Sequence, residues 1–345
     1  MPLIKGPLRE RLKDLRDRSR EATYRYGAAS LYYRVASRSF DRETNAVFAG
    51  IREHHRKTHA GTEVFELRRR IHMIEKGLTM KPRRDTFAVA YIQALVDRLG
   101  RSLELGVLEE STIAWARDVL DGYFEATDTS KSAVITKARS AYKRLDLTSD
   151  LAYCGPATPL PPAVKFDSGM VSALAHHRRS VRWYTDMPVD RSIVDEAIQV
   201  AIESPTACNR VPYRFLLFDA PKDARRIAAI AGGTAGYVQN IQSLAVVVGD
   251  LSAYLDERDR HLIYIDGSLA AMGFLYSLES NGVASCCINW PDLQEPERKI
   301  SSLLGLASYE RVVMLIAYGY ADPDGLAPAS PKFSLDHARR HSRLD

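Results

Sequence analysis

The stretch "RRSVRWYTD" (residues 178–186) sets three arginines and a serine within five positions, shortly before an amphipathic helix. Guanidinium groups and a hydroxyl are the donors that a bound phosphate needs, because charged donors make strong, directional hydrogen bonds to its oxygens. A solvated basic turn would have the same composition, and the stretch taken alone favours that blander interpretation. The rest of the chain must separate the two.

Downstream of this stretch, the sequence alternates between predicted helices and buried strands. An amphipathic helix is predicted at 189–205, with Asp190 or Ser192 as its N-cap, and a longer apolar helix at 261–282. Short apolar runs rich in β-branched or aromatic residues predict buried strands at 213–219, 244–250 and 310–320. The second half of the chain is therefore predicted to be α+β, with a sheet flanked by helices.

The first half has a different character. Residues 1–150 indicate helices almost throughout, because apolar residues recur at three- and four-residue spacing. The predicted helices are 85–100, 111–126 and 132–147. Four prolines and a glycine follow in 153–164. We therefore expect an all-helical N-terminal domain (1–150), a proline-rich linker (151–167) and a second domain (168–345).

Composition excludes several classes of protein. The 345 residues are 46% hydrophobic and 26% charged, as in an ordinary globular protein. A net charge of +5 without a basic, aromatic-rich stripe argues against nucleic-acid binding. Four cysteines without CxxC spacing predict neither a disulfide framework nor a zinc site, and reduced thiols are favoured over a vicinal Cys286–Cys287 disulfide. The chain shows neither a secretory signal nor a membrane-spanning run, so a cytoplasmic location is expected.

Three further segments offer contacts for a flat, phosphate-bearing ligand. In "SPTACNRVPYRF" (204–215), small residues allow close approach, and Asn209 offers both a donor and an acceptor. In "GVASCCINWPD" (282–292), a run of small residues could present backbone amides to a planar ring. In "PASPKFSLD" (328–336), Lys332 could meet a phosphate. Each alone would be interpreted as a loop.

In this order, the segments resemble the FMN-dependent nitroreductase superfamily, over about residues 168–337. That family has an arginine-rich "RRSxR" element followed by a "P-S/T-x-x-N-x-x-P-W/Y-x-F" loop. The sequence departs from the family in three places. Val211 stands where many relatives have glutamine, Tyr213 replaces the commoner tryptophan, and Phe333 and Ser334 interrupt the usual C-terminal run beside Lys332. "SCCINWP" and "HMIEKGL" (72–78) also resemble a subgroup associated with polysaccharide-biosynthesis loci.

The resemblance implies a nitroreductase-like mixed sheet and a set of flavin contacts. Arg178 and Ser180 would hold the FMN phosphate, with Arg179 near the ribityl chain. Arg182 would lie at the pyrimidine edge of the isoalloxazine, where its charge offsets that of the reduced flavin. Asn209 would form a hydrogen bond to the isoalloxazine ring, and the resemblance therefore gives Asn209 a catalytic role beside Arg182. The remaining implied contacts are Pro205, Thr206, Ala207, Cys286, Cys287, Ile288, Ser330 and Lys332.

The implied function is an FMN-dependent NAD(P)H oxidoreductase that acts as a homodimer. Hydride would pass by a ping-pong scheme from NAD(P)H, through flavin N5, to an electron-poor acceptor such as a nitro, quinone or enone compound. NAD(P)H would bind transiently, since the sequence has no GxGxxG fingerprint. Two alternatives stay open. One is a non-enzymatic flavin-fold protein serving assembly or membrane-surface binding in a polysaccharide pathway; the other is an oxygen-using desaturase or flavin-remodelling enzyme on the same fold.

Histidines outside these motifs invite other interpretations. His72, Glu75 and Lys76 fall on one helix face at i, i+3 and i+4, with Arg69 nearby. A helical ion-pair network is favoured over a metal or acid–base site there, because only one histidine is present. No metal site is predicted. His176-His177 are expected to be exposed residues at a helix end.

Two charge-rich segments complete the analysis. Residues 250–261 are predicted to form a solvated loop or lid. Residues 3–20 carry leucines at helical spacing among basic residues, which would suit a peripheral membrane anchor. An amphipathic helix docked on the protein is favoured over that anchor.

Overall fold

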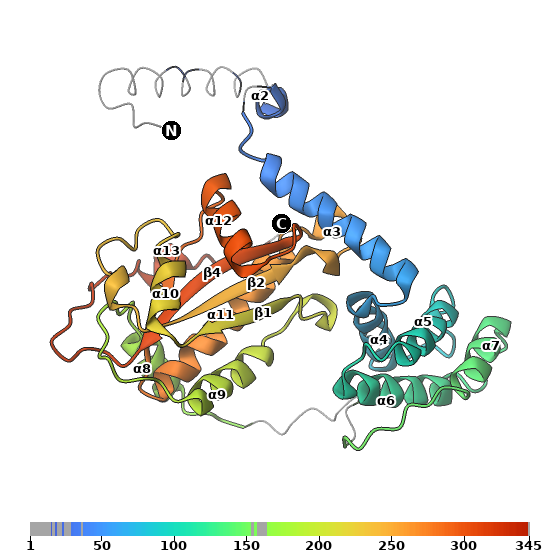
Figure 1. The fold of residues 1–345 in the computed structure, drawn as a ribbon. Coiled ribbons are helices and arrows are strands. Elements are labelled where there is room, and N and C mark those ends of the chain that lie inside the picture. The colour runs from blue at the N-terminus through green and yellow to red at the C-terminus, as the bar shows by residue number, and fades with distance from the viewer. Residues whose placement is uncertain are drawn as a thin grey trace.

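The computed structural model describes residues 15, 18, 23, 29–35, 37–152, 155–156 and 164–343. Its N-terminal helices are α2 (Ala29–Val35), α3 (Asp41–Ala60), α4 (Val64–Leu78), α5 (Ile92–Glu104), α6 (Glu110–Ala126) and α7 (Ala133–Tyr142). Figure 1 shows α4–α7 as a group beside the sheet, with α3 running from that group across the sheet region. Most of 3–20, and residues 153–154 and 157–163 of the predicted linker, lie outside the described residues.

Helices α4–α7 enclose a hydrophobic cluster of their own. The helix predicted at 85–100 begins only at Ile92, so that prediction is wrong for its first turns. Phe87 explains the difference, because its ring lies edge-on to Tyr123 at 5.0 Å between centroids and packs against the bare backbone of Gly77. A Cβ at Gly77 would stand 2.5 Å from the Phe87 ring. Tertiary packing therefore holds 85–91 in a non-helical path.

Helix α3 packs against the sheet region. Ala46 and Val47 are buried in one cluster with Leu251, Tyr254 and other apolar residues. At Gly50 the helix approaches so closely that a Cβ would stand 2.7 Å from the Leu251 carbonyl oxygen. The predicted solvated loop at 250–261 is thus wrong for its first part, since 251–254 are buried beneath α3.

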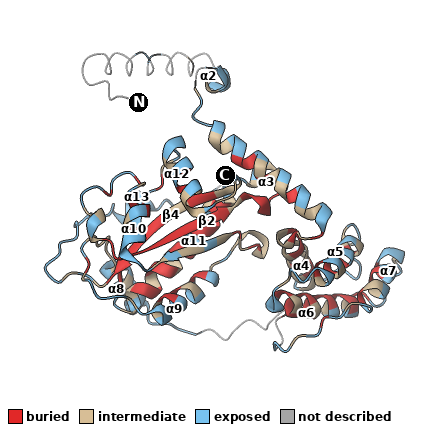
Figure 2. Cartoon of the chain, viewed as in Figure 1, coloured by how far each residue is buried: buried red, intermediate tan, exposed pale blue. Residues whose placement is uncertain are grey.

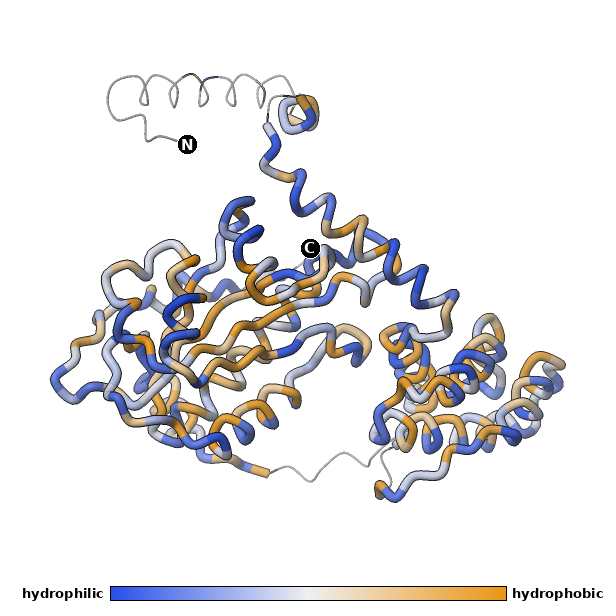
Figure 3. The backbone as a smooth tube through the Cα atoms, in the orientation of Figure 1, coloured by the Kyte–Doolittle hydropathy of each residue, from blue (hydrophilic) through white to orange (hydrophobic). Residues whose placement is uncertain are grey.

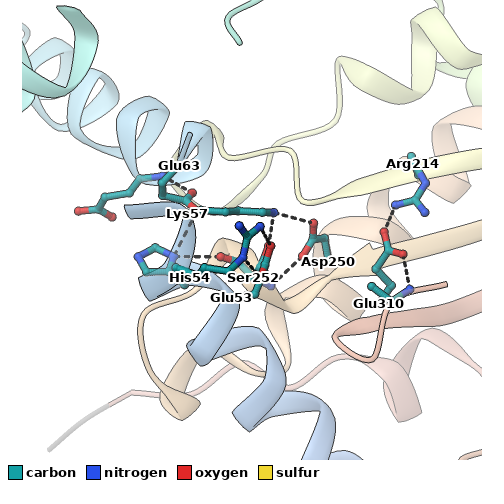
Figure 4. A network of polar contacts seen from close by, with 11 residues as sticks. Glu53, His54, Lys57, Glu63, Arg214, Asp250, Ser252 and Glu310 are labelled. Atoms are coloured by element: carbon teal, nitrogen blue, oxygen red, sulfur yellow. Dashed lines mark hydrogen bonds and ion pairs between the residues drawn. The ribbon is translucent and has the colours of Figure 1, made fainter. Parts of the chain in front are cut away.

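A partly buried polar network joins α3 to the end of strand β2 (Ser243–Asp250), as Figure 4 shows. Lys57 Nζ donates to Ser252 Oγ at 2.9 Å and lies 3.9 Å from Asp250 Oδ2. His54 Nδ1 is 2.9 Å from the Ser252 carbonyl oxygen and 3.8 Å from Glu63 Oε2. Two polar side chains of α3, Lys57 and His54, therefore find hydrogen-bond partners just after β2.

The sheet contains β1 (Tyr213–Phe218), β2 (Ser243–Asp250), β3 (Ala284–Ile288) and β4 (Glu310–Gly319) in the order β1-β2-β4-β3, all antiparallel. The strands predicted at 213–219, 244–250 and 310–320 are β1, β2 and β4, whereas β3 lies in a segment that the sequence alone suggests is a loop. Around the sheet lie α8 (Ser168–His177), α9 (Arg191–Ile202), α10 (Pro221–Ala228), α11 (Leu262–Ser280), α12 (Gln294–Leu304) and α13 (Leu335–Ala338). The α+β fold is as predicted.

Alternating strand residues fill two cores, one on each face of the sheet. Val246 and Val248 face α10 and α12, while Ala245 and Val247 face α9 and α11. Figure 2 shows the strands buried between these helices, and Figure 3 shows hydrophobic residues running along them. Of the two predicted N-caps for α9, Asp190 is used, accepting from the Ser192 amide at 2.8 Å. No helix within the described ranges is long and apolar enough to cross a bilayer.

Candidate functional site

The backbone of the arginine-rich stretch lies along the free edge of β3. Ser180 forms a parallel bridge with Ser285, and the Val181 amide donates to the Ser285 carbonyl oxygen at 3.1 Å. Further along, Tyr184 pairs with Ala321 in the antiparallel sense, and its buried hydroxyl donates to the Val181 carbonyl at 2.7 Å. The sheet therefore has both parallel and antiparallel pairing at this edge. These hydrogen bonds fix the backbone from which the side chains of 178–184 project.

Four side chains from this region gather around one buried thiol. Burial raises the pKa of Cys286, and the groups that oppose this shift are Arg182, Tyr237, Arg178 and Ser180. The Arg182 guanidinium lies over the Tyr237 ring at 5.6 Å from its centroid, and Arg182 Nη1 donates to the Ser180 carbonyl at 3.1 Å. The structure thus brings together three of the predicted phosphate and pyrimidine contacts and one of the predicted small-residue contacts.

The arginines here have no carboxylate partner among the residues that the structure describes. Within the described part of the chain, no ion pair of 4.0 Å or less involves Arg178, Arg179 or Arg182. Arg179 turns back instead, donating to the carbonyls of His176 and Arg178 (the latter at 3.2 Å) at the end of α8. A basic side chain favours that position because the helix dipole places negative charge there. Arg178 and Arg182 therefore carry uncompensated positive charge at this edge of the sheet.

The predicted ring-contact loop is held at the start of α11. It contains a short 3₁₀ turn, η1 (Ala207–Asn209), preceded by the exposed Pro205. The Ala207 amide donates to Oδ2 of the buried Asp266 at 3.1 Å. Burial raises the pKa of Asp266, and this hydrogen bond opposes the shift. The Val211 amide donates to Thr206 Oγ1 at 3.2 Å.

In one chain, this loop and the arginine stretch lie far apart. The loop is bonded to Asp266 in the first turns of α11. The arginine stretch follows His177, whose Nδ1 pairs with Glu279 near the other end of α11 at 2.6 Å. The two positions on the helix are thirteen residues apart, or about 20 Å at 1.5 Å per residue. The predicted site residues thus form two groups at opposite ends of α11. The expected helix-end position of His176-His177 is confirmed, and the Glu279 pair adds to it.

The remaining predicted contacts divide between strand and tail. Cys286 and Cys287 are successive residues of β3 and project to opposite faces, the first buried and the second exposed, and both are free thiols as predicted. Ile288 is buried at the end of the same strand. Ser330 and Lys332 are exposed in the segment after β4, and no hydrogen bond or ion pair among residues 164–343 joins them to the arginine stretch. This structure does not bring those two residues to the site.

Several residues that shape the site were not predicted. A lone carboxylate inside an apolar helix, as at Asp266, is a readable signal, because a buried charge needs a partner. The sequence around Tyr237 and Asn240 carries no comparable signal. The Asn240 side chain accepts from the Tyr184 amide at 2.6 Å and so anchors the arginine stretch from a distant loop. Arg68, from α4, bonds the Asn209 carbonyl oxygen at 2.9 Å and is likewise visible only in three dimensions.

The "HMIEKGL" helix face carries only part of the predicted ion-pair network, since His72 contacts Glu75 while Arg69 pairs with Glu66. His72 Nδ1 lies 3.0 Å from Glu75 Oε2, and Trp115 Nε1 donates to Glu75 Oε1 at 3.0 Å. Among the residues that the structure describes, no group of three or more His, Cys, Asp and Glu side chains is arranged to hold a metal ion. At this face, Glu75 therefore links His72 to Trp115.

The part of the chain that carries the sheet is similar to known proteins. The model of the nitroreductase family matches residues 175–242 and 234–320, which span the arginine stretch, the η1 loop and all four strands. This part of the chain has the nitroreductase fold. The match falls within the part of the chain for which the two motifs predicted this superfamily, while the helices before residue 150 lie outside it.

Individual relatives are distant. An NADH dehydrogenase of Thermus thermophilus is 27% identical over 179 residues, which cover 43% of this chain and 85% of that protein. A Bacillus subtilis protein named as an NAD(P)H nitroreductase, YdgI, is 25% identical over 187 residues, covering 44% of this chain and 88% of that protein. Among solved structures, an FMN-dependent nitroreductase of Clostridium difficile aligns with a TM-score of 0.42 and 21% identity, over 50% of this chain and 98% of that one.

Proposed function

We propose that the protein is an FMN-dependent oxidoreductase that takes hydride from NAD(P)H and passes it to an electron-poor small molecule. The observation that carries the proposal is the gathering of Arg178, Ser180 and Arg182 at the edge of β3, with no carboxylate partner in the described part of the chain. Uncompensated guanidinium groups beside a hydroxyl suit a dianionic phosphate, because each contributes a charge-assisted hydrogen bond. The names of the two relatives above support the same chemistry.

The residues present fit the flavin in a second respect. Arg182 is held by the Ser180 carbonyl and by the Tyr237 ring, so its charge is fixed in place before any ligand binds. A preorganised charge stabilises an anion without reorganisation during the reaction. FMN, when bound, would supply the two-electron hydride chemistry. Arg178 and Ser180 would hold its phosphate, and Arg182 would offset negative charge at the pyrimidine edge.

We also propose that the site is completed by a second copy of the chain. The η1 loop contacts Asp266 and the segment before the arginine stretch contacts Glu279, about 20 Å further along α11. We therefore infer that one chain does not present both to one isoalloxazine ring. Large apolar side chains are exposed on α8, α9 and α11, and they include Met170, Val171, Val200, Ile202, Ile265 and Leu269. Such a surface is typical of an interface between subunits. A homodimer that buries it would place one chain's loop near the partner's arginines.

The mixing of two defective chains tests the cofactor and the composite site together. Arg178→Ala removes a phosphate contact and Asn209→Ala removes a ring contact, so each homodimer should bind FMN at least about tenfold more weakly. Co-expression with two different tags isolates the mixed dimer. If each site takes its arginine from one chain and its asparagine from the other, that dimer keeps one intact site.

The expected result is one tightly bound FMN per mixed dimer and about one per chain in the wild type, read from the visible spectrum. A colourless wild type that does not bind added FMN would refute the flavin function and favour the non-enzymatic alternative. A wild type that binds FMN while the mixed dimer does not would refute the composite site alone. Steady-state turnover of NADH and NADPH with nitro and quinone acceptors then separates a reductase from an oxygen-using enzyme. The cytoplasmic location and the polysaccharide-associated subgroup remain predictions.

A further inference from the structure

Arg68 of α4 joins the helical region to the loop before β1. Its Nε donates to the Asn209 carbonyl oxygen at 2.9 Å, and its Nη1 donates to Thr112 Oγ1, also at 2.9 Å. The guanidinium lies over the ring of Trp115 at 5.1 Å from the centroid. Burial lowers the pKa of Arg68, and Glu109 opposes the shift. A half-buried charge with two directed hydrogen bonds and a ring beneath it is fixed in orientation.

The side chains behind Arg68 are fixed as well. Trp115 is buried and donates its indole N–H to Glu75, which in turn contacts His72. Thr112, the second acceptor, is buried at the start of α6. The "HMIEKGL" helix face thus supports the tryptophan on which Arg68 rests. This gives the motif a role that the proposed chemistry left unassigned.

The loop itself has a backbone that needs external support. Cys208, Asn209 and Val211 all have positive φ, at 56°, 52° and 54°. Such residues cost energy because their Cβ atoms crowd the backbone, and they persist only where surrounding contacts hold them. On the side facing α4, a cavity of about 610 Å³ lies between the loop and the helical region, and both Arg68 and Asn209 line it. Arg68 therefore supports a strained turn that borders open space.

We propose that Arg68 is a positioning residue for the ring-contact loop, and that the helical region serves in this way to shape the active site. Its hydrogen bond fixes the carbonyl of the same residue whose side-chain amide is assigned to the isoalloxazine. No hydrogen bond within the described part of the chain uses that amide, so it is available to a ligand. The catalytic meaning of the proposal rests on the proposed flavin function; the structural part does not.

Two variants in the same helix provide the test. Arg68→Ala removes the bond to the loop. Arg70→Ala is the matched control, because Arg70 also lies over a ring, that of Tyr91 at 5.0 Å, and bonds Glu66 at 2.5 Å without reaching the loop. Amide hydrogen exchange of 207–211 is measured first in flavin-free protein. FMN affinity and the shape of the bound-flavin spectrum follow.

We expect exchange in the loop to quicken at least about tenfold in Arg68→Ala, from the loss of one charge-assisted hydrogen bond, and to stay unchanged in Arg70→Ala. FMN affinity should fall by a similar factor, and the bound-flavin spectrum should shift, in Arg68→Ala alone. Unchanged loop exchange would overturn the proposal. Faster exchange with unchanged FMN affinity and spectrum would overturn its catalytic part. Wild-type protein that binds no FMN would instead refute the proposed function. If Arg68→Ala does not fold, Thr112→Val removes one of the two acceptors that orient the guanidinium and is read in the same way.

Discussion

Glu63 offers a stability prediction whose size follows from its surroundings. The side chain is fully buried at the start of α4, where Oε1 accepts from the Glu66 amide at 3.1 Å. Its other oxygen, Oε2, has no hydrogen-bond donor among the described residues and lies 3.8 Å from His54 Nδ1. Burial raises the pKa of Glu63 from 4.5 to about 7. The folded protein therefore favours the protonated acid.

The sign and size of the effect follow from proton linkage. Between pH 4.5 and 7 the folded state holds a proton that the unfolded state has released, so this contribution to stability is lost as pH rises through that window. A shift of about 2.5 pKa units at 1.36 kcal/mol each corresponds to about 3 kcal/mol. Glu63→Gln resembles the protonated acid in shape and charge. We thus expect the variant to gain about 3 kcal/mol relative to wild type between pH 4.5 and 7.5.

Urea-induced unfolding of both proteins across this pH range measures the difference. Burial lowers the pKa of His54, so its own contribution is lost as pH falls below about 6.5, but it is common to both proteins and largely cancels. Glu53→Gln is the control, because the bond from Arg56 lowers the pKa of Glu53, which then stays ionised above pH 5. A difference between Glu63→Gln and wild type that is the same at pH 5 and pH 7.5 would refute the reasoning.

Two other predictions concern the flavin and the two parts of the chain. Arg182→Ala should lower the flavin midpoint potential, measured in a dye-coupled titration, by roughly 30–65 mV. This shift is the equivalent of one charge-assisted hydrogen bond of about 1.5–3 kcal/mol. Arg178→Ala should instead weaken FMN binding with little change in the potential of the flavin that stays bound. Loss of FMN from Arg182→Ala with an unchanged potential would assign Arg182 to the phosphate instead. Limited proteolysis between residues 150 and 165 should not release two stable pieces, because one face of α3 packs against the sheet region. Two folded fragments that separate by size would contradict this.

Local pattern predicted much of the fold. The strands that became β1, β2 and β4 are continuous apolar runs, which have few alternatives to burial in a sheet. β3, with the sequence "ASCCI", escaped because its small side chains carry little strand preference and its place depends on pairing with β4. Phe87 shows the opposite error, since a helical pattern there gave way to packing on Gly77.

The residue types of the candidate site could be predicted from the sequence, but the way distant segments come together there could not. Arg178, Ser180 and Arg182 are close in sequence, so their convergence needs only a local turn and one bridge to Ser285. Asn209 lies near none of them, because α11 separates the two motifs within a chain. No periodicity in a single sequence encodes a contact between chains or one as distant as that of Arg68.

The seating of α3 has a consequence for how such a chain could arise. Helices α4–α7 have a core of their own and resemble a segment that could be added to an existing enzyme. Helix α3 has no such core of its own. Its Gly50 lies against the backbone of Leu251, and Tyr254 is buried beneath the helix. Removal of α3 would therefore expose the apolar residues at 251–263 that it covers. A chimera that replaces residues 41–60 should therefore fold only if residues 251–263 are replaced with them.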